Sequence, residues 1–442
     1  MRIHLIAIGG SAMHNMALAL HHNGFVITGS DDAIFEPSKS RLEEKGLLPA
    51  EMGWFPEKII NNLDAIILGM HARENNPELE KAKEIGIPIY SYPEYIYEQS
   101  KDKKRIVIGG SHGKTSITAM ILHVLQNLNI DCDYMVGAQL EGFDTMVKLT
   151  HDAPIIILEG DEYLSSPIDR RPKFHLYQPH IAVLSGIAWD HINVFPTFEM
   201  YVNQFRIFKE MIEDTLIYCS EDEDLCKLAR EETKCKLISY STPKHKINNG
   251  VTSVEGTDLF IFGDHNLQNI NAAKLVCNEL GVSDNDFYKE ISTFKGASNR
   301  LELVKRTTIS AIYKDFAHSP SKLKATTSAM KKQFANRKLV ACIELYTFSS
   351  LNEEFLKQYK GSIDEPDMAI VYFNPKAIAH KKLEPITKEQ VLSAFERTNL
   401  LVFTESKKLE KYLKSLNWKN QNLLMMSSGN FDGMNFEELI FT

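Results

Sequence analysis

The sequence has no long apolar run and no pair of cysteines at the spacing of a metal or redox motif. No stretch approaches the roughly 18 consecutive apolar residues of a membrane-spanning helix, and the N-terminus lacks the length and cleavage site of a signal peptide. The absence of Cys-x-x-Cys spacing argues against both a disulfide framework and a zinc site. We therefore expect a cytoplasmic protein with no membrane partner. The cysteines are Cys132, Cys219, Cys226, Cys235, Cys277 and Cys342.

The chain has fewer basic residues than acidic ones. Lysine and arginine number 50 against 58 acidic residues, so the formal net charge is -8, and no long basic run offsets it. This balance argues against a nucleic-acid partner. The 442 residues, 43% of them hydrophobic and 24% charged, suffice for about three globular domains. We expect a monomeric soluble enzyme.

The most informative segment is 105–116. A short apolar stretch, 106–108, enters a turn of small residues, and an apolar helical pattern follows from 117 to 125. A strand that meets a glycine turn at a helix N-terminus directs several backbone N–H groups at one point, where the helix dipole favours negative charge. Lys114 would reach the β- and γ-phosphates of a nucleotide, and the hydroxyl of Thr115 or Ser116 would bind Mg²⁺.

This segment departs from the strict phosphate-loop pattern at one position. Ile108 stands where a glycine is expected, six residues before Lys114. The alternative is an ordinary strand–turn–helix corner with a chance lysine. The Gly-Lys-Thr run in this setting favours binding of a nucleoside triphosphate.

Residues 1–98 alternate predicted strands and helices, which indicates a parallel sheet that binds ligands at the carboxyl ends of its strands. A glycine turn at 9–12 follows the first strand, and Gly29-Ser30-Asp31 follows the second. Ser11 and His14 replace two glycines of the dinucleotide-binding pattern, so a purely structural domain is an open alternative. The predicted strands are 3–8, 25–28, 65–68 and 87–90, with a helix at 13–22.

A charged segment, 98–105, predicts a linker to a second part that ends near 295. There, a buried strand at 154–158 ends in Glu159-Gly160-Asp161-Glu162, and a strand at 181–184 leads to Trp189-Asp190-His191. These groups should face the same edge as the phosphate loop, where a Mg²⁺-binding carboxylate is expected. The alternative for any single acid is a solvated loop residue.

Residues 296–442 alternate again and predict a second doubly wound domain. A strand at 309–313 reaches a polar run at 314–320, and a helix follows at 321–334. Further strands are predicted at 339–343, 368–371, 400–403 and 423–426.

Six short motifs occur in an order that resembles the Mur ligases, the ATP-dependent amide-forming enzymes of bacterial cell-wall synthesis, over essentially the whole chain. Each motif is short, but six in family order are jointly specific. The motifs are Gly-Ser-Asp at 29–31, Gly-Ser-His-Gly-Lys-Thr at 110–115, Glu-x-Asp-Glu at 159–162, Asp-His at 190–191, Gly-x-His-Asn-x-x-Asn at 263–269 and Asp-Phe-Ala-His-x-Pro at 315–320.

The resemblance implies an α/β fold of three domains. These are a Rossmann-like domain for a UDP-sugar at 1–98, a central parallel sheet of the phosphate-loop ATPase type at 105–295, and a Rossmann-like C-terminal domain at 296–442. It also implies ATP and Mg²⁺ as cofactors and UDP-N-acetylmuramate as the acid substrate. The lactyl carboxylate would be phosphorylated by ATP and then attacked by an amine.

The resemblance also assigns roles to individual residues. The catalytic residues would be Lys114, Glu159, His191 and Arg300. The ATP-binding residues would be Gly110, Ser111, His112, Gly113, Lys114, Thr115, Ser116, Asn266, Asn269, Arg300 and Asp315. The Mg²⁺ ligands would be Thr115, Glu159 and His191. The UDP-sugar would contact Gly10, Ser11, Ala12, Met13, Ser30, Asp31 and His71.

Two branches of the family use UDP-N-acetylmuramate itself. One adds L-alanine, and the other recycles the tripeptide L-alanyl-γ-D-glutamyl-meso-diaminopimelate. The segment 168–177 resembles the recycling branch, and Arg170, Arg171 and Lys173 would suit a carboxylate-rich peptide, with His318 a further peptide contact. We therefore predict the tripeptide as substrate, with L-alanine as the alternative.

Some positions depart from the family pattern. Gly186 and Asn299 replace an asparagine and an arginine, Ser319 replaces a histidine, and 344–349 lacks the expected Glu-Pro-Arg-Ser-Asn-Thr. These departures leave the third residue of the peptide open. Two other classes of protein are alternatives to this interpretation. A folate-type polyglutamate ligase would lack the UDP-sugar site, and a non-catalytic nucleotide-binding regulator would lack Lys114, Glu159 or His191.

Overall fold

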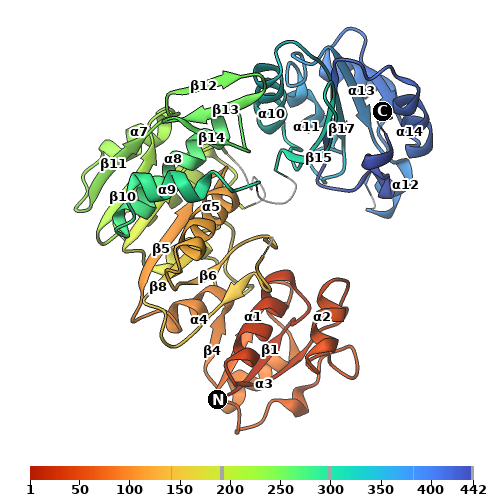
Figure 1. Ribbon diagram of the computed structural model, residues 1–442. Helices are drawn as coiled ribbons and strands as arrows, with labels where there is room; N and C mark the ends of the chain where they lie inside the picture. Colours follow the sequence, from red (N-terminus) through yellow and green to blue (C-terminus); the bar gives the residue numbers. More distant parts are fainter. Residues whose placement is uncertain (141, 190–193, 297–299, 382, 440–442) are drawn as a thin grey trace. The chain divides into compact units, whose positions relative to one another are not determined.

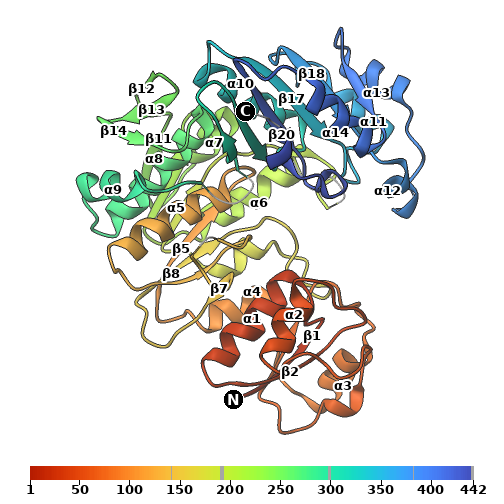
Figure 2. The ribbon, with the colours of Figure 1, turned by 45° about the vertical axis from the view of Figure 1, so that its right-hand side comes forward.

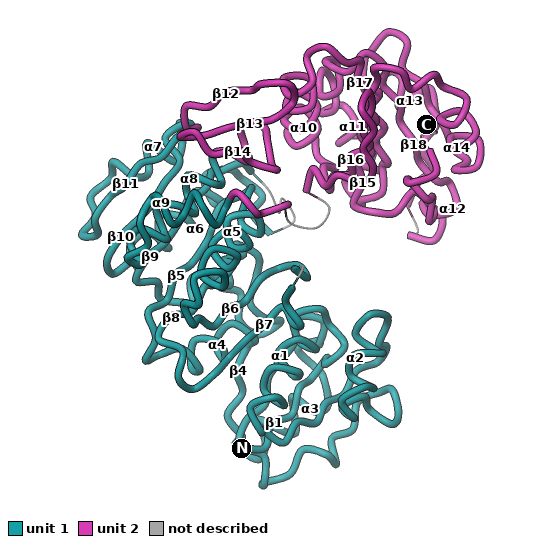
Figure 3. The backbone as a smooth tube through the Cα atoms, viewed as in Figure 1, with its two compact units in different colours: residues 1–241, 268–291 teal, residues 242–267, 292–442 magenta. Residues whose placement is uncertain are grey.

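The computed structural model describes residues 1–140, 142–189, 194–296, 300–381 and 383–439. The chain forms two compact units (Figure 3). Unit 1 comprises residues 1–241 and 268–291, and unit 2 comprises residues 242–267 and 292–442. No helix in the described part of the chain is both long and apolar enough to span a bilayer. The domain boundaries predicted from the sequence stay predictions.

The first sheet of unit 1 is wholly parallel. Its strands are β1 (Arg2–Ile6), β2 (Val26–Ser30), β3 (Ala65–Leu68) and β4 (Ile89–Ser91), in the order β2-β1-β3-β4. Ile6, Ile66 and Leu68 pack with Leu79 and Ala82 of α3 in one hydrophobic cluster. The connecting helices are α1 (Ser11–His22), α2 (Ser38–Glu44), α3 (Pro77–Ile85) and α4 (Tyr92–Glu98), with the 3-10 turn η1 (Pro56–Lys58).

The second sheet of unit 1 has the order β11-β10-β9-β5-β8-β6-β7 and is parallel except at its last strand. Its strands are β5 (Lys104–Gly109), β6 (Asp133–Met135), β7 (Val147–Lys148), β8 (Ile155–Glu159), β9 (Ile181–Leu184), β10 (Thr215–Cys219) and β11 (Lys236–Tyr240). The apolar runs of β5, β8 and β9 are buried, as expected for a parallel sheet covered on both faces. The helical segments are α5 (Lys114–Asn127), η2 (Lys173–Tyr177), α6 (Phe198–Glu210), α7 (Glu223–Arg230), α8 (Asp264–Glu279) and α9 (Asp284–Ile291).

The charged segment 98–105, predicted as a linker, joins the end of α4 to the start of β5 and contains buried charges. Lys103 and Arg105 are buried, and the Lys103 ammonium lies 2.9 Å from Asp133 Oδ2. Arg105 donates hydrogen bonds to backbone carbonyls, including that of Ser100 at 3.0 Å. Buried charges of this kind require paired or hydrogen-bonded partners. The polar residues here therefore hold the start of β5 in place.

A small antiparallel sheet opens unit 2, and the sequence did not predict it. Its strands are β12 (His245–Asn248), β13 (Val251–Val254) and β14 (Thr257–Leu259). Thr252 Oγ1 donates to Gln333 Oε1 at 2.7 Å, which joins this sheet to helix α10 (Pro320–Gln333). β12 is mostly exposed and shows no alternation of apolar residues, so the pattern on which strand prediction depends is missing.

The large sheet of unit 2 is drawn in teal to blue in Figures 1 and 2. Its strand order is β15-β16-β20-β17-β18-β19, with only the edge strand β15 antiparallel. In β17, Leu339, Ala341 and Ile343 join one core cluster, whereas Val340 and Cys342 join another. Both faces are therefore covered, as in the predicted doubly wound domain. The strands are β15 (Glu302–Arg306), β16 (Ala311–Asp315), β17 (Lys338–Glu344), β18 (Met368–Tyr372), β19 (Leu401–Phe403) and β20 (Gln421–Met426).

The remaining helices of unit 2 lie between or after these strands. The first cluster includes side chains of α10, α11 (Glu353–Leu356) and α13 (Lys388–Phe395), and the second includes side chains of α14 (Ser406–Ser415). Helix α12 (Pro375–His380) follows β18. The predicted α/β architecture with an N-terminal, a central and a C-terminal sheet is confirmed. The 3-10 turns are η3 (Lys357–Tyr359), η4 (Phe431–Gly433) and η5 (Phe436–Glu438).

The buried ion pair of Lys103 and Asp133 generates a prediction about stability. Asp133→Ala leaves the Lys103 ammonium buried without its counter-charge, and such a loss costs about 3–5 kcal/mol. We expect a clear fall in the urea midpoint of unfolding. Lys101→Ala is the matched control, because the Lys101–Glu98 pair is exposed and its loss should leave the midpoint unchanged. Equal midpoints for the two variants would contradict a stabilising role for the buried pair.

Candidate active site at a phosphate loop

The loop between β5 and α5 requires glycine at two positions. Gly110 and Gly113 have φ values of 115° and 79°, in the left-handed region that disfavours side chains. A Cβ atom at Gly110 would lie 2.4 Å from Ser185 Oγ, and one at Gly113 would lie 2.4 Å from Asn269 Oδ1. Neighbouring residues therefore press directly on the loop. The predicted phosphate-binding residues occupy this loop and the first turn of α5, namely Gly110, Ser111, His112, Gly113, Lys114, Thr115 and Ser116.

The parallel sheet surrounds this loop with the ends of two other strands. β5 lies between β8 and β9, and all three run in the same direction. The segments after β8 and β9 therefore emerge at the same edge as the loop, where Ser111 N donates to Gly186 O at 3.0 Å. The sequence-based expectation that these strand ends converge is met by the geometry.

Lys114 is held at the loop by an ion pair. Its ammonium donates to Glu162 Oε2 at 2.7 Å and to Gly110 O at 2.8 Å. Burial disfavours the charged form, but the carboxylates of Glu162, Asp161 and Glu159 outweigh it and raise the pKa of Lys114. The loop thus carries a permanent positive charge at neutral pH.

Glu162 is in turn held by a tyrosine that the sequence did not reveal. Tyr201 OH, from α6, donates to Glu162 Oε1 at 2.9 Å and lies 3.1 Å from Ser111 Oγ. The network therefore runs from Lys114 through Glu162 and Tyr201 back to the loop. Glu162 was indicated by its place after a buried strand, but no local pattern marks Tyr201.

Thr115 and Glu159, both predicted as Mg²⁺ ligands, are hydrogen-bonded to each other. Thr115 Oγ1 donates to Glu159 Oε1 at 2.9 Å, and Gly137 N donates to Glu159 Oε2 at 2.8 Å. Burial raises the pKa of Glu159, although Gly137, Lys114 and Thr115 oppose the shift. A hydroxyl beside a carboxylate supplies the oxygen ligands that Mg²⁺ prefers, so the pair fits the predicted metal site.

The third predicted metal ligand lies outside the described residues. His191 and its neighbour Asp190 belong to the segment 190–193. Within the described ranges, no group of three or more histidine, cysteine or acidic side chains has the arrangement of a metal site. The metal assignment of Thr115, Glu159 and His191 stays a prediction.

The predicted UDP-sugar residues surround the N-terminus of α1. Gly10, Ser11, Ala12 and Met13 form the cap and first turn of this 12-residue helix. Gly9 N donates to Asp31 Oδ2 at 2.7 Å, and Ser30 is fully buried beside it. Burial raises the pKa of Asp31. His71 is exposed in the segment after β3, at the same edge of the parallel sheet.

Two of the three predicted peptide-binding cations are already paired. Arg171 Nη2 lies 2.6 Å from Asp169 Oδ2, and Lys173 Nζ lies 2.6 Å from Asp161 Oδ2. Arg170 is exposed. Internal carboxylates thus take up charge that the sequence analysis assigned to a peptide substrate.

The remaining predicted residues belong to unit 2, except Asn269. Asp315 accepts hydrogen bonds from Leu301 N and Ala317 N, both at 2.7 Å. Arg300 stacks on the ring of Phe316 at 4.8 Å from its centroid, and His318 Nδ1 lies 2.8 Å from Phe316 O. Asn266 donates to Phe262 O at 3.0 Å. Asp315 and Phe316 thus contact several neighbouring residues at the start of the third part of the chain.

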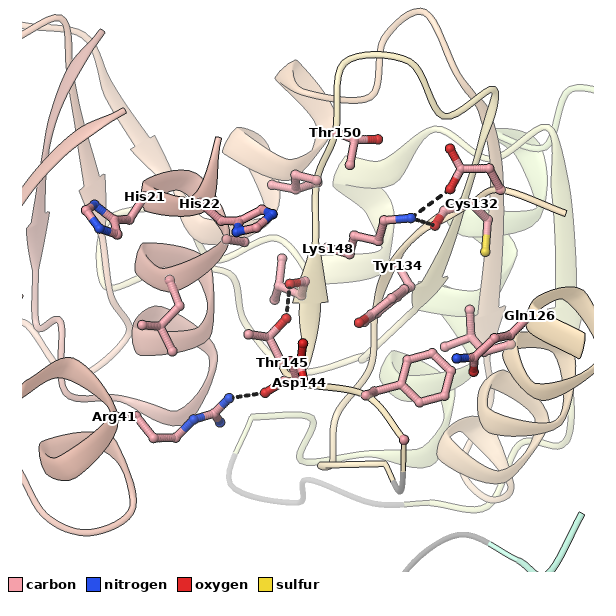
Figure 4. A pocket seen from close by; sticks show the side chains of 18 of the residues that line it. His21, His22, Arg41, Gln126, Cys132, Tyr134, Asp144, Thr145, Lys148 and Thr150 are labelled. Carbon is pink, nitrogen blue, oxygen red and sulfur yellow. Dashed lines mark hydrogen bonds and ion pairs between the residues drawn. The ribbon is translucent and has the colours of Figure 1, made fainter. Parts of the chain in front are cut away.

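Unit 1 also contains a pocket of about 1260 Å³ (Figure 4). It is lined by the last turns of α1 and α5 and by the segment 142–150, and no predicted site residue lines it. Its Lys148 is paired with Asp131 at 2.7 Å. We assign the chemistry to the phosphate loop, where the catalytic types of side chain converge, rather than to this pocket.

Two family profiles match the chain. The profile "Mur ligase family, catalytic domain" matches residues 2–104, and the profile "Mur ligase middle domain" matches residues 108–277. The chain belongs to the Mur ligase family. It is an enzyme that uses ATP to form an amide bond. The resemblance noted in the sequence is thus confirmed at the level of the family.

Individual relatives of this Mur ligase are distant but nearly full-length. A UDP-N-acetylmuramate–L-alanine ligase of Sulfurihydrogenibium sp. (strain YO3AOP1) is 27% identical over 444 residues, covering 97% of this chain and 95% of the relative. A UDP-N-acetylmuramate–alanine ligase of Thermotoga maritima has a TM-score of 0.71 and 18% identity, covering 98% of this chain and 97% of the other. A murein peptide ligase of Psychrobacter arcticus has a TM-score of 0.64 and 22% identity, with the same coverage. These solved structures share the fold.

The contact between Gly113 and Asn269 predicts a specific loss of activity. Gly113→Ala would push the loop away from Asn269, and a misplacement of about 1 Å can cost about 10²-fold in rate. Gly46→Ala is the matched control, because Gly46 also has a positive φ, 67°, but nothing lies within 4 Å of its added Cβ. We expect kcat/KM for ATP to fall only in the Gly113 variant. Equal activity of both variants would contradict the crowding argument.

The position of Lys114 at the phosphate loop predicts that its charge is required for turnover in this Mur ligase. Lys114→Ala removes the charge that faces the phosphates, and the loss of such a contact typically lowers kcat by about 10²–10³-fold. Circular dichroism should show an intact fold. A folded variant with nearly normal turnover would contradict the assignment.

Proposed function

We propose that this Mur ligase joins the lactyl carboxylate of UDP-N-acetylmuramate to the amino group of an L-alanyl substrate. Free L-alanine and the tripeptide L-alanyl-γ-D-glutamyl-meso-diaminopimelate share that amino group, so the same amide bond forms with either. The observation that carries the proposal is the cluster of Lys114, Glu159 and Glu162 at the phosphate loop. It provides the charges needed to activate a carboxylate with ATP.

Free L-alanine is the first candidate amine. The relative from Sulfurihydrogenibium, which is named for L-alanine, aligns with nearly the whole chain. The pairing of Arg171 with Asp169 and of Lys173 with Asp161 also weakens the argument for a carboxylate-rich peptide. The relatives and the geometry therefore favour L-alanine, the alternative predicted from the sequence, over the tripeptide, which was the main prediction.

The tripeptide is the second candidate. It is favoured by the resemblance of segment 168–177 to the recycling branch and by Asp-Phe-Ala-His at 315–318. Arg170 is exposed and is the one residue of the basic segment that remains suited to a peptide carboxylate. The two candidates make opposite predictions about substrate preference.

The reaction follows from the chemistry of the carboxylate, which is too poor an electrophile to react with an amine unaided. An oxygen of the lactyl carboxylate attacks the γ-phosphorus of ATP, the bond to the β-phosphate oxygen breaks, and ADP leaves. The amine nitrogen then attacks the carbonyl carbon of the acyl phosphate, loses a proton, and inorganic phosphate departs. The first step brings like charges together, and Lys114 is positioned to neutralise them.

A divalent cation would share this neutralisation. Thr115 and Glu159 would hold it, with His191 as a further predicted ligand. When bound, Mg²⁺ supplies positive charge beside the transferring phosphoryl group. Lys114 provides a positive charge at the loop independently of the cation.

We infer that the acid substrate binds at the N-terminal sheet. The first turn of α1 presents backbone N–H groups, a natural site for the diphosphate of a UDP-sugar. Asp31 accepts from Gly9 N at 2.7 Å and so fixes the glycine turn next to that helix end. This arrangement supports Gly10, Ser11, Ser30 and Asp31 as sugar-nucleotide contacts.

The proposal is tested by measuring phosphate release from ATP in the presence of UDP-N-acetylmuramate and each amine, with product masses as confirmation. We expect release to require both the UDP-sugar and an L-alanyl amine, and to be faster with L-alanine. Faster ligation of the tripeptide would favour the second candidate. Release that does not depend on UDP-N-acetylmuramate would contradict the proposal.

A further inference from the structure

The carboxyl ends of the parallel strands of unit 2 form an edge where ligands of such sheets normally bind. β16, β20, β17 and β18 are neighbours in that order and run in the same direction. β17 ends at Glu344, and the segment 345–349 continues from it along this edge. This is the segment in which the expected family pattern is missing.

Two large aromatic side chains on this segment are exposed. Tyr346 is 37% exposed and Phe348 is 62% exposed. A Cβ atom at Gly429 would lie only 2.9 Å from Tyr346 Cδ2, so the segment after β20 packs directly on the Tyr346 ring. The edge thus presents a firmly supported tyrosine beside a more open phenylalanine.

A lysine cation lies over both rings. Lys381 Nζ is 4.1 Å from the centroid of Tyr346 and 4.8 Å from that of Phe348. The negative ring faces stabilise the ammonium group there. In the described part of the chain, no carboxylate forms an ion pair with Lys381. Its hydrogen-bond donors remain able to bind an anion.

Glu344, the nearby acid at the end of β17, is engaged elsewhere. It is 2% exposed and its Oε2 accepts from Phe431 N at 2.9 Å and from Ser427 Oγ. Its carboxylate therefore organises the segment that supports Tyr346. The closest contacts of the Lys381 ammonium are therefore with the two aromatic rings, while its charge also opposes the rise that burial causes in the pKa of Glu344.

We propose that Lys381, positioned by Tyr346 and Phe348, binds a carboxylate of the amine substrate. This inference rests on the proposed function, in which either L-alanine or the tripeptide brings a carboxylate. The phosphates of ATP and the UDP-sugar have candidate sites in unit 1, at the loop before α5 and at the start of α1. Among the cations predicted for the carboxylate of the amine substrate, Arg171 and Lys173 are already paired and only Arg170 is exposed. Tyr346 also stands where the family resemblance predicts an arginine.

The kinetic test uses Lys381→Ala with whichever amine is ligated. Loss of one charge-assisted contact should raise KM for the amine about 10-fold or more, with kcat and the KM values for ATP and UDP-N-acetylmuramate nearly unchanged. Lys381→Arg should restore most of the affinity. Lys376→Ala, an exposed lysine of α12, is the matched control and should have no effect. An unchanged KM for the amine, or a raised KM for ATP instead, would overturn the inference.

A second readout does not depend on turnover. Lysine methylation followed by mass spectrometry should show Lys381 protected, relative to Lys376, when L-alanine or the tripeptide is added together with UDP-N-acetylmuramate and a non-hydrolysable ATP analogue. No phosphate release with either amine would overturn the proposed function. An amine that supports phosphate release yet leaves Lys381 unprotected would overturn this inference alone. Protection by the ATP analogue without an amine would also overturn it.

Discussion

The parallel pairing of β5 with β8 on one side and β9 on the other is the constraint on which the active site depends. Because all three strands end at one edge, residues far apart in the sequence reach the same loop. Glu159 follows from β8, and the backbone of Gly186 follows from β9. Shifting the register of either strand by one residue would turn these groups to the other face of the sheet.

Charge balance at this edge explains why the lysine and the acids occur together. Glu159, Asp161 and Glu162 alone would repel a triphosphate, yet they keep Lys114 protonated despite its burial. Lys173 offsets Asp161 at 2.6 Å, which lowers the negative charge further. ATP therefore brings negative charge to a site where lysines and acids are already paired with each other. A divalent cation would offset the negative charge of the acids that remain and of the triphosphate.

Local patterns in the sequence were enough to predict the phosphate loop, the acidic strand end and the α/β class. Each depends on a few consecutive residues, as in the run from Gly110 to Thr115. Tyr201 could not be predicted, because its contact with Glu162 exists only once α6 packs against the strand ends. The burial of Lys103 and Arg105 could not be predicted either, because their partners, Asp133 and backbone carbonyls, are brought to them only by the fold.

The same limitation applies to substrate choice. Arg171 and Lys173 look available in the sequence, whereas the fold pairs them with Asp169 and Asp161. Lys381 gives no local indication of its role, because Tyr346 and Phe348 reach it from another strand end. Family motifs thus indicate the shared ATP chemistry, whereas the contacts that we propose for the amine join segments distant in the sequence.

The central claim, activation of a carboxylate by ATP, is tested most directly by following oxygen. UDP-N-acetylmuramate labelled with ¹⁸O in its lactyl carboxylate would be incubated with ATP and the amine, and the inorganic phosphate analysed by mass spectrometry. The account predicts that one labelled oxygen passes to each phosphate, because the acyl phosphate breaks between carbon and oxygen. Phosphate without label would show that its oxygen came from water, and would contradict the account.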